Sequence, residues 1–105
     1  MVNYQRLNLE IESNVQRALL GAVSESLRAV SIDAGNNKIY YRCIFDDKAT
    51  KNEKQLLSIA ASEVVADFPE TFTINEEYLI TPESEKMDHL KHLVFLRYEA
   101  SNQRI

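Results

Sequence analysis

Apolar side chains recur at helical spacing between Thr50 and Pro69, and this pattern predicts the helix around which the chain is organised. Thr50 and Glu53 have the spacing of a capping box, in which each residue satisfies a backbone N–H of the other. Pro69 ends the helix, because the residue before a proline is pushed out of the helical region. The stripe that must be buried consists of Leu57, Ala60, Ala61, Val64 and Phe68.

A second amphipathic segment precedes the helix predicted between Thr50 and Pro69. Ser13 and Gln16 form another capping box, which predicts a helix that starts at Ser13. Residues 1–12 fit either a strand or an extension of this helix. Gly21 lies inside the predicted helix, where glycine costs up to about 1 kcal/mol relative to alanine. The apolar face of this helix contains Ile11, Val15, Ala18, Leu19, Ala22, Val23 and Leu27.

Elsewhere the apolar period is two, which is typical of strands. Residues 30–33 and 38–45 alternate on either side of a four-residue turn, 34–37, and predict a hairpin. Residues 71–81 and 92–99 predict a third and a fourth strand. Glu76 interrupts the apolar face of the third strand, and we interpret it as a bulge or an exposed strand end. The inward side chains are Ile39, Tyr41, Cys43 and Phe45, then Phe72, Ile74, Tyr78 and Ile80, then Val94, Leu96 and Tyr98.

These elements predict an α+β fold in the order α-β-β-α-β-β, formed by one domain over residues 1–105. Two hairpins would give a four-stranded antiparallel sheet in a two-layer sandwich, with both helices covering one face. The other face should then be exposed to water. Apolar side chains predicted on that open face are Tyr40, Ile44, Leu93 and Phe95, and they could form an interaction patch.

Composition and cysteine content favour a soluble cytoplasmic protein. The 105 residues contain one cysteine, which excludes an internal disulfide. No apolar run approaches the roughly 20 residues that span a bilayer. Acidic residues stand in the first dozen positions, where a signal peptide would be apolar. We therefore expect no membrane association.

The net charge of −4 is concentrated in one part of the sequence. Residues 63–88 contain eight acidic side chains and one basic one, a balance of −7, whereas the rest of the chain is close to neutral. Such a segment repels phosphates, which argues against nucleic acid as a ligand. It suits a basic protein partner, although an ordinary solvated acidic surface has the same composition.

The sequence contains no motif that specifies chemistry. His89, His92 and Asp88, with Cys43 elsewhere, have the residue types of a metal site but not the fixed spacing of a helical ligand pair. Cys43 lies in mid-strand on the apolar face and is interpreted as a core residue. Glu63, Asp67 and Glu70 are solvated carboxylates rather than a general acid and base. We expect no enzyme activity, no cofactor and no metal.

Several segments nevertheless resemble a known class of proteins. They are 18–21 (ALLG), 40–42 (YYR), 63–69 (EVVADFP) and 94–99 (VFLRYE). In these segments the chain resembles small α+β bacterial immunity proteins of contact-dependent growth-inhibition and similar polymorphic toxin systems. The resemblance implies a protein that binds and blocks a cognate toxin, often a basic nuclease, and has no activity of its own.

We therefore predict an immunity protein whose partner is a basic toxin domain. Two alternatives are a homodimer formed through the open sheet face and a small ligand-binding domain that uses the charged loop 82–91. The partner-binding residues predicted from the acidic segment are Glu63, Asp67, Glu70, Glu76, Glu77, Tyr78, Glu83 and Glu85.

Overall fold

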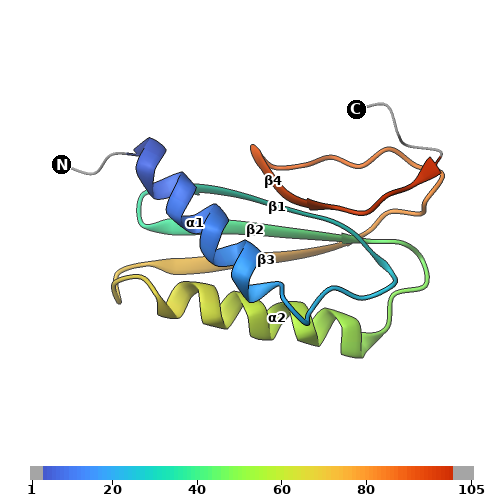
Figure 1. The fold of residues 1–105 in the computed structure, drawn as a ribbon, viewed down its shortest axis with the longest axis horizontal. Helices are drawn as coiled ribbons and strands as arrows, with labels where there is room; N and C mark the ends of the chain where they lie inside the picture. The colour runs from blue at the N-terminus through green and yellow to red at the C-terminus, as the bar shows by residue number, and fades with distance from the viewer. Residues whose placement is uncertain (1–3, 101–105) are drawn as a thin grey trace.

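Two helices pack on one face of a four-stranded mixed sheet (Figure 1). The structure is a computed structural model that describes residues 4–100, so the first three and last five residues of the predicted domain lie outside it. The element order α-β-β-α-β-β is as predicted. The elements are α1 (Tyr4–Ala18), β1 (Leu27–Gly35), β2 (Lys38–Phe45), α2 (Lys51–Ala66), β3 (Thr73–Ile80) and β4 (His92–Leu96).

Helix α2 confirms the capping prediction. The Thr50 N–H donates to Glu53 Oε1 at 2.8 Å, and the Glu53 N–H donates to Thr50 Oγ1 at 3.2 Å. Leu57, Ala60, Ala61 and Val64 are buried, as their spacing predicted. Phe68 lies beyond the helix end and is only half-buried, with its ring 5.4 Å from that of Phe72. The buried stripe therefore ends one turn earlier than expected.

Helix α1 confirms the alternative in which the residues before Ser13 extend the helix, but it ends earlier than its predicted apolar face. Within the described residues it begins at Tyr4, and the buried residues Ile11 and Val15 and the partly buried Leu7 continue the stripe upstream of Ser13. The gain from burying that stripe outweighs the capping preference of Ser13, which lies exposed in mid-helix. The helix ends at Ala18, and Gly21 adopts a left-handed φ of +82° in the following turn.

The hairpin between β1 and β2 closes with two residues rather than four. Asn36 and Asn37 have φ values of 52° and 59°, the left-handed pair of a type I′ turn. Because both asparagines accept this conformation, pairing continues to Gly35 and Lys38, directly beside the turn.

The predicted antiparallel sheet is wrong for β3, which pairs parallel with β2. Helix α2 has 16 residues and extends for about 24 Å at 1.5 Å per residue, so it carries the chain back along the sheet. Thr73 therefore starts beside Lys38, and the strand order is β3-β2-β1-β4. The β2–β3 register has no interruption at Glu76, so the alternative of a bulge there is excluded.

The strand ends also differ from the inward pattern predicted for them. Ile80, the last residue of β3, is 46% exposed. Strand β4 stops at Leu96, and Tyr98, beyond its end, is 77% exposed. Side chains at the ends of edge strands have no neighbouring strand on one side, which leaves them accessible to water.

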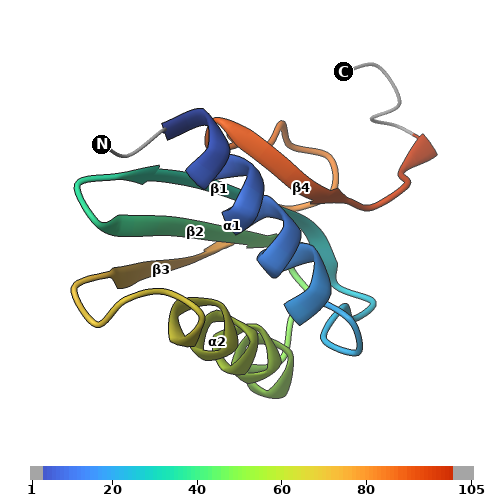
Figure 2. The same cartoon turned by 60° about the vertical axis from the view of Figure 1, so that its left-hand side comes forward.

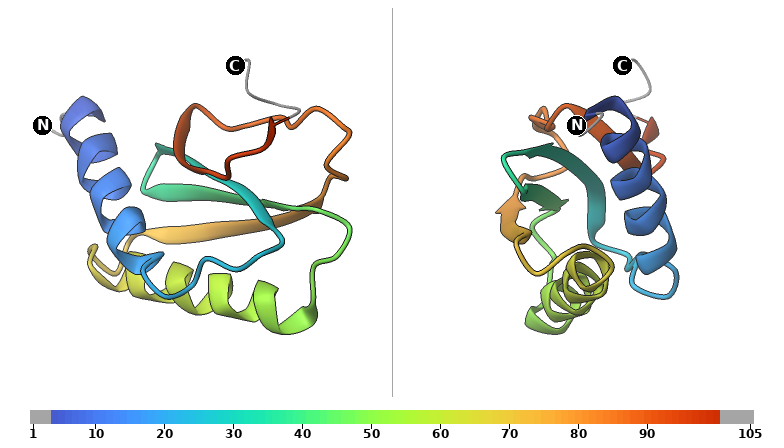
Figure 3. Two further views of the ribbon diagram at one scale, coloured as in Figure 1. Left: turned by 45° about the vertical axis from the view of Figure 1, so that its right-hand side comes forward. Right: turned by 90° about the vertical axis from the view of Figure 1, so that its left-hand side faces the viewer.

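The second face of the sheet is covered rather than open. Because β3 and β4 lie on opposite edges, residues 81–91, here called the crossing loop, traverse that face on the side away from α1 (Figure 3). The Leu90 N–H donates to Ser31 Oγ at 2.9 Å, and Arg42 Nη1 donates to the Asp88 carbonyl at 2.8 Å. Ser31 is buried, and so is Ile44, which is 1% exposed.

This cover corrects the expectation of an exposed patch on the sheet. Ile44 is buried, and Phe95 is partly buried against the core. Tyr40 and Leu93 remain about two-fifths exposed, at 38% each. A homodimer through this face would therefore have to use isolated side chains around the crossing loop.

Candidate functional site

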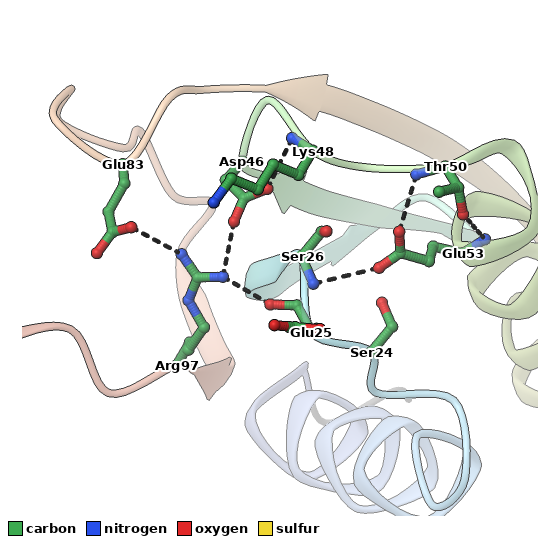
Figure 4. Close-up of a pocket in the computed structure, with 9 residues that line it drawn as sticks. All are labelled: Ser24, Glu25, Ser26, Asp46, Lys48, Thr50, Glu53, Glu83 and Arg97. Atoms are coloured by element: carbon green, nitrogen blue, oxygen red, sulfur yellow. Dashed lines mark hydrogen bonds and ion pairs between the residues drawn. The ribbon is translucent and has the colours of Figure 1, made fainter.

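Six charged side chains line a hollow of about 520 Å³ at one end of the sheet (Figure 4). Four segments form it: the connection between α1 and β1, the chain from the end of β2 into the first turn of α2, the crossing loop, and the residue that follows β4. We call it the Arg97 pocket. Its lining residues are Ser24, Glu25, Ser26, Asp46, Lys48, Thr50, Glu53, Glu83 and Arg97.

Arg97 joins these segments through its guanidinium. Nη1 donates to the Glu25 carbonyl at 2.7 Å and to Asp46 Oδ2 at 2.9 Å. Nε donates to Glu99 Oε2 at 3.0 Å, while Nη2 lies 3.9 Å from Glu83 Oε2. A guanidinium with this many acceptors is held in place and is not available to a bound anion.

Asp46 is the buried acid of the pocket. Burial alone would raise the pKa of its carboxyl, but the hydrogen bonds from Arg97 and from the Lys48 N–H outweigh burial and hold the pKa below its ordinary value. The Lys48 N–H donates to Asp46 Oδ1 at 2.9 Å. Both carboxylate oxygens therefore have defined donors.

Glu53 closes the other side of the pocket. Its pKa falls to about 2, first because of the neighbouring Ser24 hydroxyl, against the opposing effect of burial, and then through the N–H groups of Thr50 and Ser26. The Ser26 N–H donates to Glu53 Oε2 at 3.2 Å. In its present rotamer the Ser24 hydroxyl faces Glu53 without completing a hydrogen bond to any described residue (Figure 4).

The chemistry that this pocket offers is that of fixed negative charge. Four carboxylates line it against two cationic side chains. Asp46 and Glu53 are ionised at neutral pH because their pKa values are lowered, so neither is a proton donor there. Carboxylates held by backbone and arginine donors are suited to attracting a basic group and not to acid–base catalysis.

Only one of the eight predicted contact residues, Glu83, lines the Arg97 pocket. Glu63 and Asp67 line a small hollow together with Arg17 of α1, and Glu70 is exposed in the turn after α2. Glu85 is exposed in the crossing loop. The acidic residues that cluster in the sequence between positions 63 and 88 are therefore distributed around the molecule.

Strand β3 separates the next three predicted residues. Glu76 accepts hydrogen bonds from Ser58 of α2 and from Tyr78, at 2.8 and 2.5 Å. Glu77 points to the other face of the sheet, where its Oε1 lies 2.7 Å from Arg42 Nε. Glu76 and Tyr78 are thus brought together, and Glu77 is not.

Sequence reasoning did not find Asp46, Glu53 and Arg97 as one site. Glu53 was recognised only as a capping residue, and no sequence pattern marked Asp46 as a site residue. The local signals were visible, but Arg97 is 51 residues from Asp46, and no spacing rule connects them.

The cysteine and histidine side chains considered as candidate reactive groups or metal ligands lie outside the Arg97 pocket. Burial raises the pKa of the Cys43 thiol to about 12, against the opposing hydrogen bond from Tyr41. His92 Nδ1 lies 3.4 Å from Glu12 Oε1. Within residues 4–100 no group of three His, Cys, Asp or Glu side chains could hold a metal ion. Neither described helix combines the length and apolar character of a membrane span.

The molecule is thus a small α+β domain with carboxylate-lined hollows on its surface. The family model of the MafI2 immunity protein matches residues 9–99, and the chain belongs to that family. It is a bacterial immunity protein of a polymorphic toxin system, which confirms the class predicted from the sequence segments. No curated protein matches the chain.

Proposed function

We propose that this chain binds a cognate toxin domain and blocks it, and that it has no catalytic activity of its own. Membership of the immunity protein family over residues 9–99 carries this proposal. An immunity protein acts by mass action on its toxin, so its surface chemistry has to match the toxin's surface.

We further propose that the toxin is a basic protein, with a nuclease as the expected activity. The support is the charge of residues 63–88, which carry a balance of −7 within a chain of net charge −4. A nuclease needs cationic groups to hold phosphates, and an acidic inhibitor competes for those groups. The acidic segment would then attract the toxin and repel its substrate.

The absence of catalysis is supported by the state of the candidate groups. Asp46 and Glu53 have lowered pKa values, and the buried Cys43 thiol has a raised one. A general acid needs a pKa near neutrality, and a nucleophilic cysteine needs a lowered pKa. Asp46 and Glu53 therefore do not have the pKa of a general acid, and Cys43 does not have the pKa of a nucleophile.

The proposed contact residues remain the eight of the acidic segment, with different roles. Glu63, Asp67 and Glu70 are exposed at the end of α2 and can meet a basic group directly. Glu76 and Glu77 already bind Ser58 and Arg42, so their charges act mainly at long range. Such attraction raises the association rate and is screened over about 8–10 Å at ordinary ionic strength.

The test uses the toxin domain encoded by the neighbouring reading frame. The purified chain should bind this domain and abolish its toxicity when the two are co-expressed. If the toxin degrades nucleic acid, the chain should stop that reaction at a one-to-one ratio. Failure to bind and to protect overturns the proposal, whereas protection from a toxin of another activity overturns only the nuclease assignment.

The acidic contacts are tested by charge reversal. Glu63→Lys with Glu70→Lys should slow association with the toxin and weaken its salt dependence, because both side chains are exposed. Asp33→Lys with Asp47→Lys, which makes the same change of net charge outside the acidic segment, is the control. Equal association rates for the two variants, or a rate indifferent to salt, would exclude this part of the proposal.

A further inference from the structure

Four large apolar side chains are exposed on α2 and on the connection between α1 and β1. Leu20 and Val23, in the connection after α1, are 80% and 45% exposed. Leu56 and Ile59, on α2, are 42% and 54% exposed. We call these four residues the apolar patch.

The connection after α1 runs beside α2 (Figures 1 and 2), and the two segments are attached to each other at both ends. The end of the connection is attached to the first turn of α2 by the bond from the Ser26 N–H to Glu53. The last turn of α1, from which the connection leaves, shares a hollow with Glu63 in the last turns of α2 through Arg17 and Ala18. Leu56 and Ile59 lie between these two attachment points along the helix.

Hydrogen bonds hold the backbone of the connection, which fixes where its exposed side chains leave the chain. The Leu20 N–H donates to the Arg17 carbonyl at 3.2 Å, and the Ala22 N–H donates to the Leu19 carbonyl at 2.9 Å. Leu19 and Ala22 are buried, while the intervening Gly21 has the left-handed φ that turns the chain. A preorganised apolar surface loses little conformational entropy when a partner binds.

Acid-lined hollows flank the patch at both ends. The Arg97 pocket at one end contains Glu25 and Glu53. A shallow groove of about 570 Å³ between α1 and the end of α2 contains Glu10 and Asp67. An apolar centre with a charged rim is the usual anatomy of a protein–protein interface.

The lysines of α2 do not share this rim. Leu56, Ile59 and Glu63 are spaced i, i+3 and i+7, so they lie on one face of the helix. Lys51 and Lys54 fall in the row of Ser58, whose hydroxyl donates to Glu76 on the β3 side. The acidic character therefore belongs to the same side of α2 as the patch.

We infer that the apolar patch anchors the toxin, and that it fits a toxin surface with apolar side chains between two basic groups. This inference rests on the proposed function and adds the surface where the toxin binds. The charge of the two flanking hollows selects a basic partner, and the four apolar side chains supply the desolvated contact that charge alone does not provide.

The test measures the affinity of the full chain for the toxin domain from the neighbouring reading frame by calorimetry. Leu20→Ala with Ile59→Ala should weaken binding by about 30-fold or more, which corresponds to the loss of one interface hot spot. Leu9→Ala with Tyr98→Ala is the matched control, because both residues are also exposed, at 61% and 77%. The control variant should bind the toxin with the affinity of the unmodified chain. Both variants should unfold at the same temperature as the unmodified chain, which shows that they are folded.

The outcomes separate this inference from the function on which it rests. If the unmodified chain does not bind the toxin, the proposed function fails. If it binds and the Leu20/Ile59 variant binds equally well, the function stands and the patch assignment is overturned. A dimer of the isolated chain that Leu20→Ala dissociates would assign the patch to a second copy and also overturn the inference.

Discussion

Arg28 and Glu99 form a bidentate ion pair in the interior, 71 residues apart in the chain. Arg28 Nε donates to Glu99 Oε2 and Nη2 donates to Glu99 Oε1, both at 2.8 Å. The two side chains are 0% and 2% exposed. Nη1 also donates to the carbonyls of Thr81, Pro82 and Glu85, at 3.0 to 3.1 Å, so Arg28 fixes the start of the crossing loop.

Removing one partner of this pair should be strongly destabilising. Glu99→Ala leaves the Arg28 guanidinium buried with two donors unsatisfied, and breaking a buried pair in this way costs about 3–5 kcal/mol. The free energy of unfolding in urea measures the effect. Arg28→Met with Glu99→Ala should cost less than the sum of the single changes, because the two residues are coupled. A loss below about 0.5 kcal/mol for Glu99→Ala, as at a surface position, would contradict this role.

Glu53 should make stability depend on pH. Its pKa is lowered from 4.5 to about 2 in the folded state, so its stabilising contribution is complete above 4.5 and is lost as the pH falls towards 2. The difference in unfolding free energy between the unmodified chain and Glu53→Gln should therefore be largest near neutral pH and shrink through this window. Urea titrations at several pH values measure it, with Glu70→Gln as the exposed control. A constant difference across the window would refute the assignment.

Cys43 should be chemically inert in the folded protein. Its thiol is buried and its pKa is raised to about 12, so almost no thiolate is present at pH 8. Iodoacetamide should alkylate the native chain about 100-fold or more slowly than the chain unfolded in urea. Mass spectrometry after timed quenching measures both rates. Rapid labelling of the native chain would show an accessible, reactive thiol instead.

The turn between β1 and β2 offers a stabilising substitution. Asn37 has a φ of 59°, a conformation that glycine adopts without steric cost. Asn37→Gly creates the Asn-Gly pair that type I′ turns favour and should raise the unfolding free energy by a few tenths to about 1 kcal/mol. Asn37→Ala should lower it. Thermal unfolding of the three chains provides the comparison, and the reverse order of stability would contradict this turn geometry.

Elements whose signals are local can be predicted from the amino-acid sequence alone. Helix α2 follows from a capping box and a stripe that lie within one segment, and β2 follows from strict alternation between Ile39 and Phe45. The first helix was predicted to continue past Gly21, but it ends at Ala18, because the left-handed Gly21 turns the chain towards β1. The immunity class also followed from local segments, because family resemblance is a property of sequence.

Only the tertiary structure decided which strands pair and which charges meet. The pairing of β3 depends on the path of α2, and the cover of Ile44 depends on a loop that joins opposite edges of the sheet. Glu76 and Glu77 are adjacent in sequence but face opposite sides of the sheet, because successive side chains of a strand alternate. The compact acidic segment of the sequence is therefore divided in space, while Arg97 comes from 51 residues away to share one pocket with Asp46 and Glu53.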